Sequence, residues 1–406
     1  MGDDGSPNGT ECGIGHRRAW SMGQGATETT LTNARLVTPR GVRVGWLRCE
    51  GARITDLGTG EPPRPGGSPI DVGGRWVLPG LVDIHIHGGA GAAFTAADPD
   101  RIMTVLEFNR YHGVTAVVGG LVSASPEDTL RQVAALAEVA DAGEIPGIYL
   151  EGPYISASKC GAHDPALLRD PDLAEFDRIV KAGRGHIKMI TVAPELPGAL
   201  DLIRAATAQG VVAAIGHTDA DYAQTRAAID AGATVATHLY NQMRPLRHRD
   251  PGPIAAVLND ERVTVELIND GVHVHPGAAQ VVFDAAGADR VALVTDAMDA
   301  TGLGDGEYTL GKLRVRVRDG QATLVSTGAI ASSTIVLPDA IRQAVHNVHG
   351  VGIEAAVHSA SAVPARALGL PGVGSLTPGN HADLLLLDAD LTVAATMHRG
   401  SWARPL

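Results

Sequence analysis

Six side chains of the kind that bind metal ions each follow a short apolar run of the sequence. They are His85 and His87 in LVDIHIH, Glu151 in GIYLE, His217 in AIGH, His238 in ATVATH and Asp296 in VALVTD. Side chains two residues apart on a strand share one face, so His85 and His87 are expected to point the same way. Nitrogen and oxygen donors of this kind suit zinc. The set predicts a centre for one or two divalent cations, with zinc preferred.

Glu151 is the residue around which two cations can be arranged, because each carboxylate oxygen can bind one. The other ligands would be His85, His87 and Asp296 at one cation and His217 and His238 at the other. A divalent cation lowers the pKa of a coordinated water toward neutrality, which supplies hydroxide as a nucleophile. Asp296 is expected to take the proton from that water and return it to a departing amine. A lone histidine at a strand end is more often structural, but six such residues at equivalent places favour a metal site.

The elements that position these residues are short apolar runs alternating with helical periods. The expected strands are LVDIH, VTAVVGGL, GIYLE, HIKMITVAPE, Val211–Ile215, ATVATH, VTVELI and VALVTD. Eight such strands separated by helices fit a (β/α)8 TIM barrel, although the alternation alone also allows a doubly wound open sheet. The polar residues favour the barrel, because the carboxyl ends of its strands meet at one mouth. Residues 305–326 are expected to form an inserted pair of hairpins.

Both ends of the chain show short β segments and turns, which suggests a small β-sandwich domain formed from both termini. The expected division is a disordered extension over residues 1–28, sandwich parts over 29–79 and 363–406, and the barrel over 80–362. The fold class is therefore α/β, a TIM barrel with a small β domain.

The net charge of −12 argues against nucleic acid or an anionic membrane surface as a partner, since either requires a basic face. The sequence contains no run of 18 apolar residues, so no membrane span is expected. Three cysteines, Cys12, Cys49 and Cys160, are too few and too scattered for a disulfide scaffold. A reducing cytoplasm is the expected compartment.

Several longer stretches narrow the function. They are PGLVDIHIHGGAG, EGPYIS, KCGAHD, IGHTDA, THLYNQM, DGVHV, LVTDAMDATG and SLTPGNHADLLLLD. In this order the chain resembles the amidohydrolase superfamily and, within it, the N-acetylglucosamine-6-phosphate deacetylases. The resemblance implies hydrolysis of N-acetyl-D-glucosamine 6-phosphate to D-glucosamine 6-phosphate and acetate, in amino-sugar catabolism and cell-wall recycling. Lys188 stands near the start of its strand, the wrong end to bridge metals as a carbamate, which counts against dihydroorotase-like or urease-like relatives.

The same resemblance implies a set of substrate contacts. Ala162 and His163 would touch the sugar, Asn241 and the backbone of Gln242 the phosphate, and Ile330 would stand near the acetyl group. His273 would polarise the acetamide carbonyl or hold a sugar hydroxyl. Arg249 would bind the phosphate across a homodimer interface. The cluster of Arg249 with its basic neighbours could also be a plain solvated face.

Some features leave alternatives open. The family usually has alanine where this chain has Gln242, and Cys160 takes a position that other residues often fill. The amino sugar could therefore be N-acetylgalactosamine 6-phosphate or another N-acyl compound, or the barrel could bind sugar phosphates without catalysis. The histidines that match no ligand position, which we interpret as bystanders, are His346, His349, His358, His381 and His398.

Overall fold

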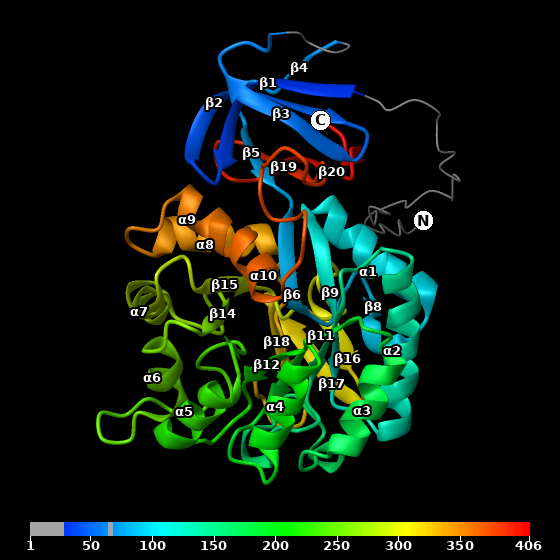
Figure 1. Ribbon diagram of the computed structural model, residues 1–406, viewed down its shortest axis with the longest axis vertical. Coiled ribbons are helices and arrows are strands. Elements are labelled where there is room, and N and C mark those ends of the chain that lie inside the picture. The colour runs from blue at the N-terminus through cyan, green and yellow to red at the C-terminus, as the bar shows by residue number, and fades with distance from the viewer. Residues whose placement is uncertain (1–27, 64–67) are drawn as a thin grey trace, which may run out of the picture.

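The computed structural model describes residues 28–63 and 68–406 of the chain. All but the last residue of the expected extension over 1–28, together with Cys12, lie outside the described residues. Cys49 and Cys160 are free thiols. Within the described ranges, no helix combines the length and the apolarity that crossing a bilayer requires. Figure 1 shows two bodies, a small sheet at one end and a larger α/β body beneath it.

The small sheet is built from both ends of the chain, as the sequence predicts. Its strands follow the order β21-β20-β19-β5-β1-β2-β3, with β4 paired to β1. Their bounds are β1 (Glu28–Thr38), β2 (Gly41–Glu50), β3 (Arg53–Thr59), β4 (Ile70–Asp71), β5 (Trp76–Pro79), β19 (Leu384–Leu387), β20 (Val393–His398) and β21 (Ser401–Arg404). In β19, Leu384 and Leu386 enter the core of this sheet, whereas Leu385 and Leu387 pack against the barrel body. A strand buried on both faces explains the uninterrupted run of leucines.

The larger body is a parallel eight-stranded barrel whose strands are paired in chain order, which confirms the predicted fold class. The strands are β6 (Leu81–Ile86), β9 (Val114–Val122), β10 (Ile148–Glu151), β11 (Ile187–Val192), β12 (Val212–Ile215), β13 (Val235–Ala236), β14 (Thr264–Ile268) and β15 (Val291–Val294). The first and last strands meet through hydrogen bonds beyond the regular pairing. The amide of Asp296 donates to the carbonyl of His85 at 2.8 Å, and the Thr295 hydroxyl donates to Asp83 at 2.6 Å.

Helices surround the barrel (Figure 1). They are α1 (Pro99–Tyr111), α2 (Pro126–Asp141), α3 (Leu173–Ala182), α4 (Ala199–Ala208), α5 (Tyr222–Ala231), α6 (Gly252–Leu258), α7 (Pro276–Ala286), α8 (Leu337–Asn347), α9 (Ile353–Ser359) and α10 (Ala362–Ala367). Helix α2 begins directly after Ser125, because the Ser125 hydroxyl accepts a hydrogen bond from the amide of Asp128 and a proline follows the cap. The residue limits of the predicted segments remain predictions.

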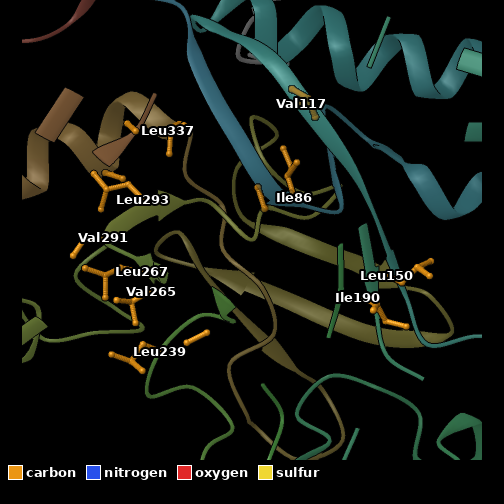
Figure 2. Close-up of a cluster of buried hydrophobic side chains, with 14 of the residues drawn as sticks. Ile86, Val117, Leu150, Ile190, Leu239, Val265, Leu267, Val291, Leu293 and Leu337 are labelled. Carbon is orange, nitrogen blue, oxygen red and sulfur yellow. The ribbon is translucent and has the colours of Figure 1, made fainter. Parts of the chain in front are cut away.

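Alternation along the barrel strands decides which side chains reach the interior. Leu150 pairs in register with Ile190, and Val265 and Leu267 pair with Val291 and Leu293, all in the layer between strands and helices (Figure 2). Because neighbours on a strand point to opposite faces, the residues next to these point inward. Glu151 and Glu266 are therefore directed into the barrel, where apolar residues would otherwise be expected.

The expected insertion after β15 is a three-stranded antiparallel sheet of β16 (Gly306–Leu310), β17 (Leu313–Arg318) and β18 (Gln321–Leu324). A short hairpin of β7 (Gly88–Gly89) and β8 (Ala92–Ala93) follows β6. Both insertions emerge at the carboxyl ends of barrel strands. This places them beside the barrel mouth.

Candidate metal centre and substrate cavity

All six candidate ligands come together at the carboxyl ends of the barrel strands and are buried. Their donor atoms form two groups, each with all atoms within 4.8 Å of one another, namely His85, His87, Glu151 and Asp296 in one and Glu151, His217 and His238 in the other. Glu151 belongs to both groups. Its Oε1 lies 3.0 Å from Nε2 of His217 and 3.1 Å from Nε2 of His238, and its Oε2 lies 2.9 Å from Nε2 of His87.

The backbone turns sharply at several of these residues. His217, His238 and Asp296 have φ values of +47°, +25° and +48°, and Gln242, which lines the same site, has +50°. Left-handed conformations cost non-glycine residues on the order of 1–2 kcal/mol each. In β6 the pairing register shifts between Asp83 and Ile86, next to the two strand-end histidines. Backbone strain gathered at one place in the fold is typical of functional sites.

Hydrogen bonds behind the cluster fix which nitrogen of each ring faces inward. Nδ1 of His85 lies 2.8 Å from Oε2 of Glu266, and Nδ1 of His217 lies 2.7 Å from the carbonyl oxygen of Lys159. Each Nδ1 is thus the donor, and the Nε2 lone pair is left for a cation. The amide of Ser123 donates to Nδ1 of His163 at 3.3 Å, so in His163 the proton sits on Nε2.

The carboxylates and imidazoles of the cluster shift one another's pKa values. Burial alone would raise the pKa of Glu151, but His85 and the hydrogen bonds from the surrounding histidines hold it well below its usual value. Burial likewise opposes ionisation of Asp296, yet His85 and His87 lower its pKa. For His87, burial lowers the pKa, but the adjacent carboxylates of Asp296 and Glu151 raise it to about 9. The two carboxylates are therefore anionic and require positive charge opposite them.

The donor set fits a divalent cation. Nε2 of His85 and Nε2 of His87 are buried and have no hydrogen-bond partner among the described residues, although both face the carboxylates of the cluster. An orphaned buried nitrogen is costly unless a ligand satisfies it. Four imidazoles and two carboxylates are the donors that zinc and its neighbours in the first transition row prefer.

A cavity of about 220 Å³ opens onto the cluster. Six of the seven predicted substrate residues line it, namely Ala162, His163, Asn241, Gln242, His273 and Ile330. Nδ1 of His273 lies 2.7 Å from Asp270, which leaves Nε2 for a ligand. Burial lowers the pKa of His163, so its ring is neutral near pH 7 and presents the Nε2 proton.

Arg249 is the predicted residue that the structure does not bring to this cavity. Its side chain is exposed on the loop before α6. Of the described residues, no lysine or arginine lines the cavity. The neighbouring Arg244 and Lys159 both face the carboxylate of Asp219, at 3.5 Å each. Within one chain, the cavity therefore offers no free cation to a phosphate.

Sequence reasoning missed the residues that hold the ligands. Glu266 is fully buried in β14 and contacts His85, and Asp270 contacts His273. The sequence does offer a signal for Glu266, because a carboxylate within the apolar run VTVELI is costly to bury unless it is paired. Asp270 lies in the stretch DGVHV, in which only His273 is predicted to have a functional role. Ser123 carries no such signal.

Comparison with known proteins agrees with this geometry. Residues 76–403 match the model of the amidohydrolase family. The N-acetylglucosamine-6-phosphate deacetylase of Vibrio furnissii is 39% identical over 82% of this chain and 82% of its own. The N-acetylgalactosamine-6-phosphate deacetylase of Escherichia coli O157:H7 is 38% identical over 88% of this chain and 96% of its own.

A solved structure is similar over nearly the whole chain. It is a variant of the N-acetyl-D-glucosamine-6-phosphate deacetylase of Mycobacterium smegmatis in complex with N-acetyl-D-glucosamine 6-phosphate. The TM-score is 0.90 and the sequence identity 46%, over 93% of this chain and all of that one.

Proposed function

Because this chain belongs to the amidohydrolase family and to its N-acetylglucosamine-6-phosphate deacetylases, we propose that it hydrolyses the acetamide of N-acetyl-D-glucosamine 6-phosphate to D-glucosamine 6-phosphate and acetate. The observation that carries the proposal is the pair of ligand groups sharing Glu151, buried beneath a cavity of about 220 Å³. The relatives supply the substrate class, since an amide-hydrolysing site alone does not specify it.

The residues around Glu151 would hold one or two divalent cations, with zinc preferred by the nitrogen-rich donor set. A bound cation supplies Lewis acidity, which lowers the pKa of water and polarises a carbonyl. Glu266 and the carbonyl of Lys159 keep the ligating nitrogens of His85 and His217 directed inward. Chelation followed by add-back of zinc, iron, cobalt and manganese tests the identity of the metal, and metal analysis of the purified protein tests its number.

Proton transfer is assigned to Asp296. It lies at the cavity wall with a lowered pKa, so it is ionised and can accept the proton of the attacking water. The same carboxyl then donates that proton to the amide nitrogen as the C–N bond breaks. His273, held through Nδ1 by Asp270, presents Nε2 to the acetamide oxygen or to a sugar hydroxyl.

The phosphate requires a cation that this cavity lacks within one chain. We propose a homodimer in which Arg249 of a second copy reaches the phosphate beside Asn241 and Gln242. Support comes from the exposed position of Arg249 and from the absence of a lysine or arginine among the described residues lining the cavity. An arginine can bind a phosphate through two parallel hydrogen bonds.

A second substrate deserves a direct comparison. The relative that acts on N-acetylgalactosamine 6-phosphate is 38% identical to this chain, nearly the same as the 39% of the Vibrio furnissii relative. The two sugars differ only in the configuration at C4. The deciding assay measures acetate release from both sugars, each with and without the 6-phosphate. We expect the highest kcat/KM for N-acetylglucosamine 6-phosphate. A higher kcat/KM for N-acetylgalactosamine 6-phosphate would reassign the substrate. If none of the sugars released acetate, the chain would be a sugar-phosphate-binding protein and not a deacetylase. The cytoplasm stays a prediction from cysteine usage.

A further inference from the structure

A second cavity lies at the opposite end of the barrel from the metal cluster, where the amino ends of the strands face the small sheet. Its volume is about 220 Å³, the same as that of the substrate cavity. Its walls come from the starts of β9 and β11, the loop before β10, the segment after α10 and the turn between β20 and β21. Both bodies of the molecule therefore contribute to it.

Among the described residues, two of the basic side chains that line this cavity, Lys188 and Arg399, have no acidic partner. Lys188, at the start of β11, has no carboxylate within ion-pairing distance among the described residues. Within the described part of the chain, the guanidinium of Arg399 donates to the carbonyl of Gly143 alone, at 2.7 Å. His381 and His398, which match no ligand position, line the same space. A protein with a net charge of −12 thus keeps two free cations at one cavity.

The two acidic groups in the wall are already engaged. Glu144 pairs with Arg110 at 2.6 Å. Asp383 accepts a hydrogen bond from the amide of Arg399 at 2.7 Å, and Nδ1 of His398 lies 3.3 Å away. Their negative charges are consequently directed at partners in the protein. The charge left for an incoming molecule is positive.

We propose that this cavity is a second binding site, specific for a phosphate-type oxyanion, distinct from the metal cluster and its substrate cavity. Lys188 and Arg399 supply the charge, and the two histidines supply hydrogen bonds. Such an anion can arrive as inorganic phosphate or as the phosphate of a sugar phosphate. Its place between the barrel and the small sheet means that binding stabilises the contact between them.

The test measures binding of inorganic phosphate to the full-length protein by calorimetry and by the phosphate-dependent rise in Tm. Lys188→Gln removes a cation that has no partner in the protein, so the fold is retained, and phosphate binding at this site should weaken about tenfold. Lys181→Gln, at an exposed position of α3 outside the cavity, is the matched control.

A parallel series in Arg249→Ala protein separates this site from the substrate cavity. The proposal predicts that phosphate binding survives in Arg249→Ala and weakens about tenfold when Lys188→Gln is added. Equal phosphate affinity in Lys188→Gln and Lys181→Gln, or complete loss in Arg249→Ala alone, would overturn it. Glucosamine 6-phosphate and glucosamine, tested in the same series, identify the source of the anion. Binding of the phosphorylated sugar alone assigns a sugar phosphate, and binding of neither phosphate compound refutes the site.

Discussion

Replacing Glu266 by glutamine tests whether a residue that touches no substrate sets the affinity of the metal centre. Glu266 is fully buried, and its Oε2 accepts from Nδ1 of His85 at 2.8 Å and from the amide of His238 at 3.2 Å. Its Oε1 has no hydrogen-bond partner in the part of the chain that the structure describes. In Glu266→Gln, the amide oxygen can keep both hydrogen bonds, and the NH2 group takes the place of the unpartnered oxygen. Only the negative charge is lost.

The expected magnitude follows from that single loss. A hydrogen bond to a charged group contributes about 1.5–3 kcal/mol, against about 0.5–1.5 kcal/mol for a neutral one. The difference, on the order of 1.4 kcal/mol, corresponds to a dissociation constant for the metal that is about tenfold larger. This lies at the lower end of the roughly 10- to 100-fold losses found when the partners of metal-bound histidines are changed.

The assay is competition for zinc between the protein and a chromophoric chelator, with kcat measured at saturating metal. Glu175→Gln is a matched control, because Glu175 is also buried, at 5% exposure, but its carboxylate pairs with Arg169 and not with a histidine of the cluster. We expect a tenfold loss of zinc affinity in Glu266→Gln only, with kcat largely restored at saturating zinc. Zinc affinities within about twofold of each other in both variants and the parent would show that His85 does not depend on Glu266.

Three further perturbations address the remaining claims. Asp296→Asn should reduce kcat by about 10²- to 10⁴-fold while the protein still takes up metal, and retained turnover would remove Asp296 from proton transfer. Arg249→Ala should raise KM for the phosphorylated sugar but not for its unphosphorylated form, and mixing Arg249→Ala with Asp296→Asn subunits should restore part of the activity if the arginine acts across a dimer. Burial raises the pKa of Asp299 from 3.8 to about 6, so the folded protein holds a proton that the unfolded chain has released, and stability should fall as pH rises through that window. Asp299→Asn should remove this loss and raise the free energy of unfolding above pH 6 by on the order of 1 kcal/mol, a value reduced for solvent screening because the group is half-buried. The measurement is urea unfolding at pH 5 and pH 7. The same change in unfolding free energy between the two pH values in the variant and the parent would contradict the prediction.

The positions of the six ligand-type residues could be predicted from the sequence because parallel strands impose a common direction. A residue at the carboxyl end of any barrel strand lies at the same mouth, so local apolar runs followed by histidine or carboxylate suffice to place it. The division into a barrel and a β domain from both termini follows in the same way from period and turn signals. Glu151 as the residue shared by two ligand groups was also foreseeable, since a carboxylate has two donor oxygens.

Contacts between distant strands had to come from the tertiary structure. The pairing of Glu266 with His85 joins residues on strands that are far apart in sequence, and no local pattern specifies which buried carboxylate meets which imidazole. Only the tertiary structure shows that Arg249 is exposed and does not line the substrate cavity of its own chain. The second cavity is the clearest case, because Lys188, Thr115 and His398 come from three separate segments that only the docking of the small sheet against the barrel brings together. Short-range periodicity fixes where a side chain stands on its own element, whereas the packing of whole elements decides which side chains become neighbours.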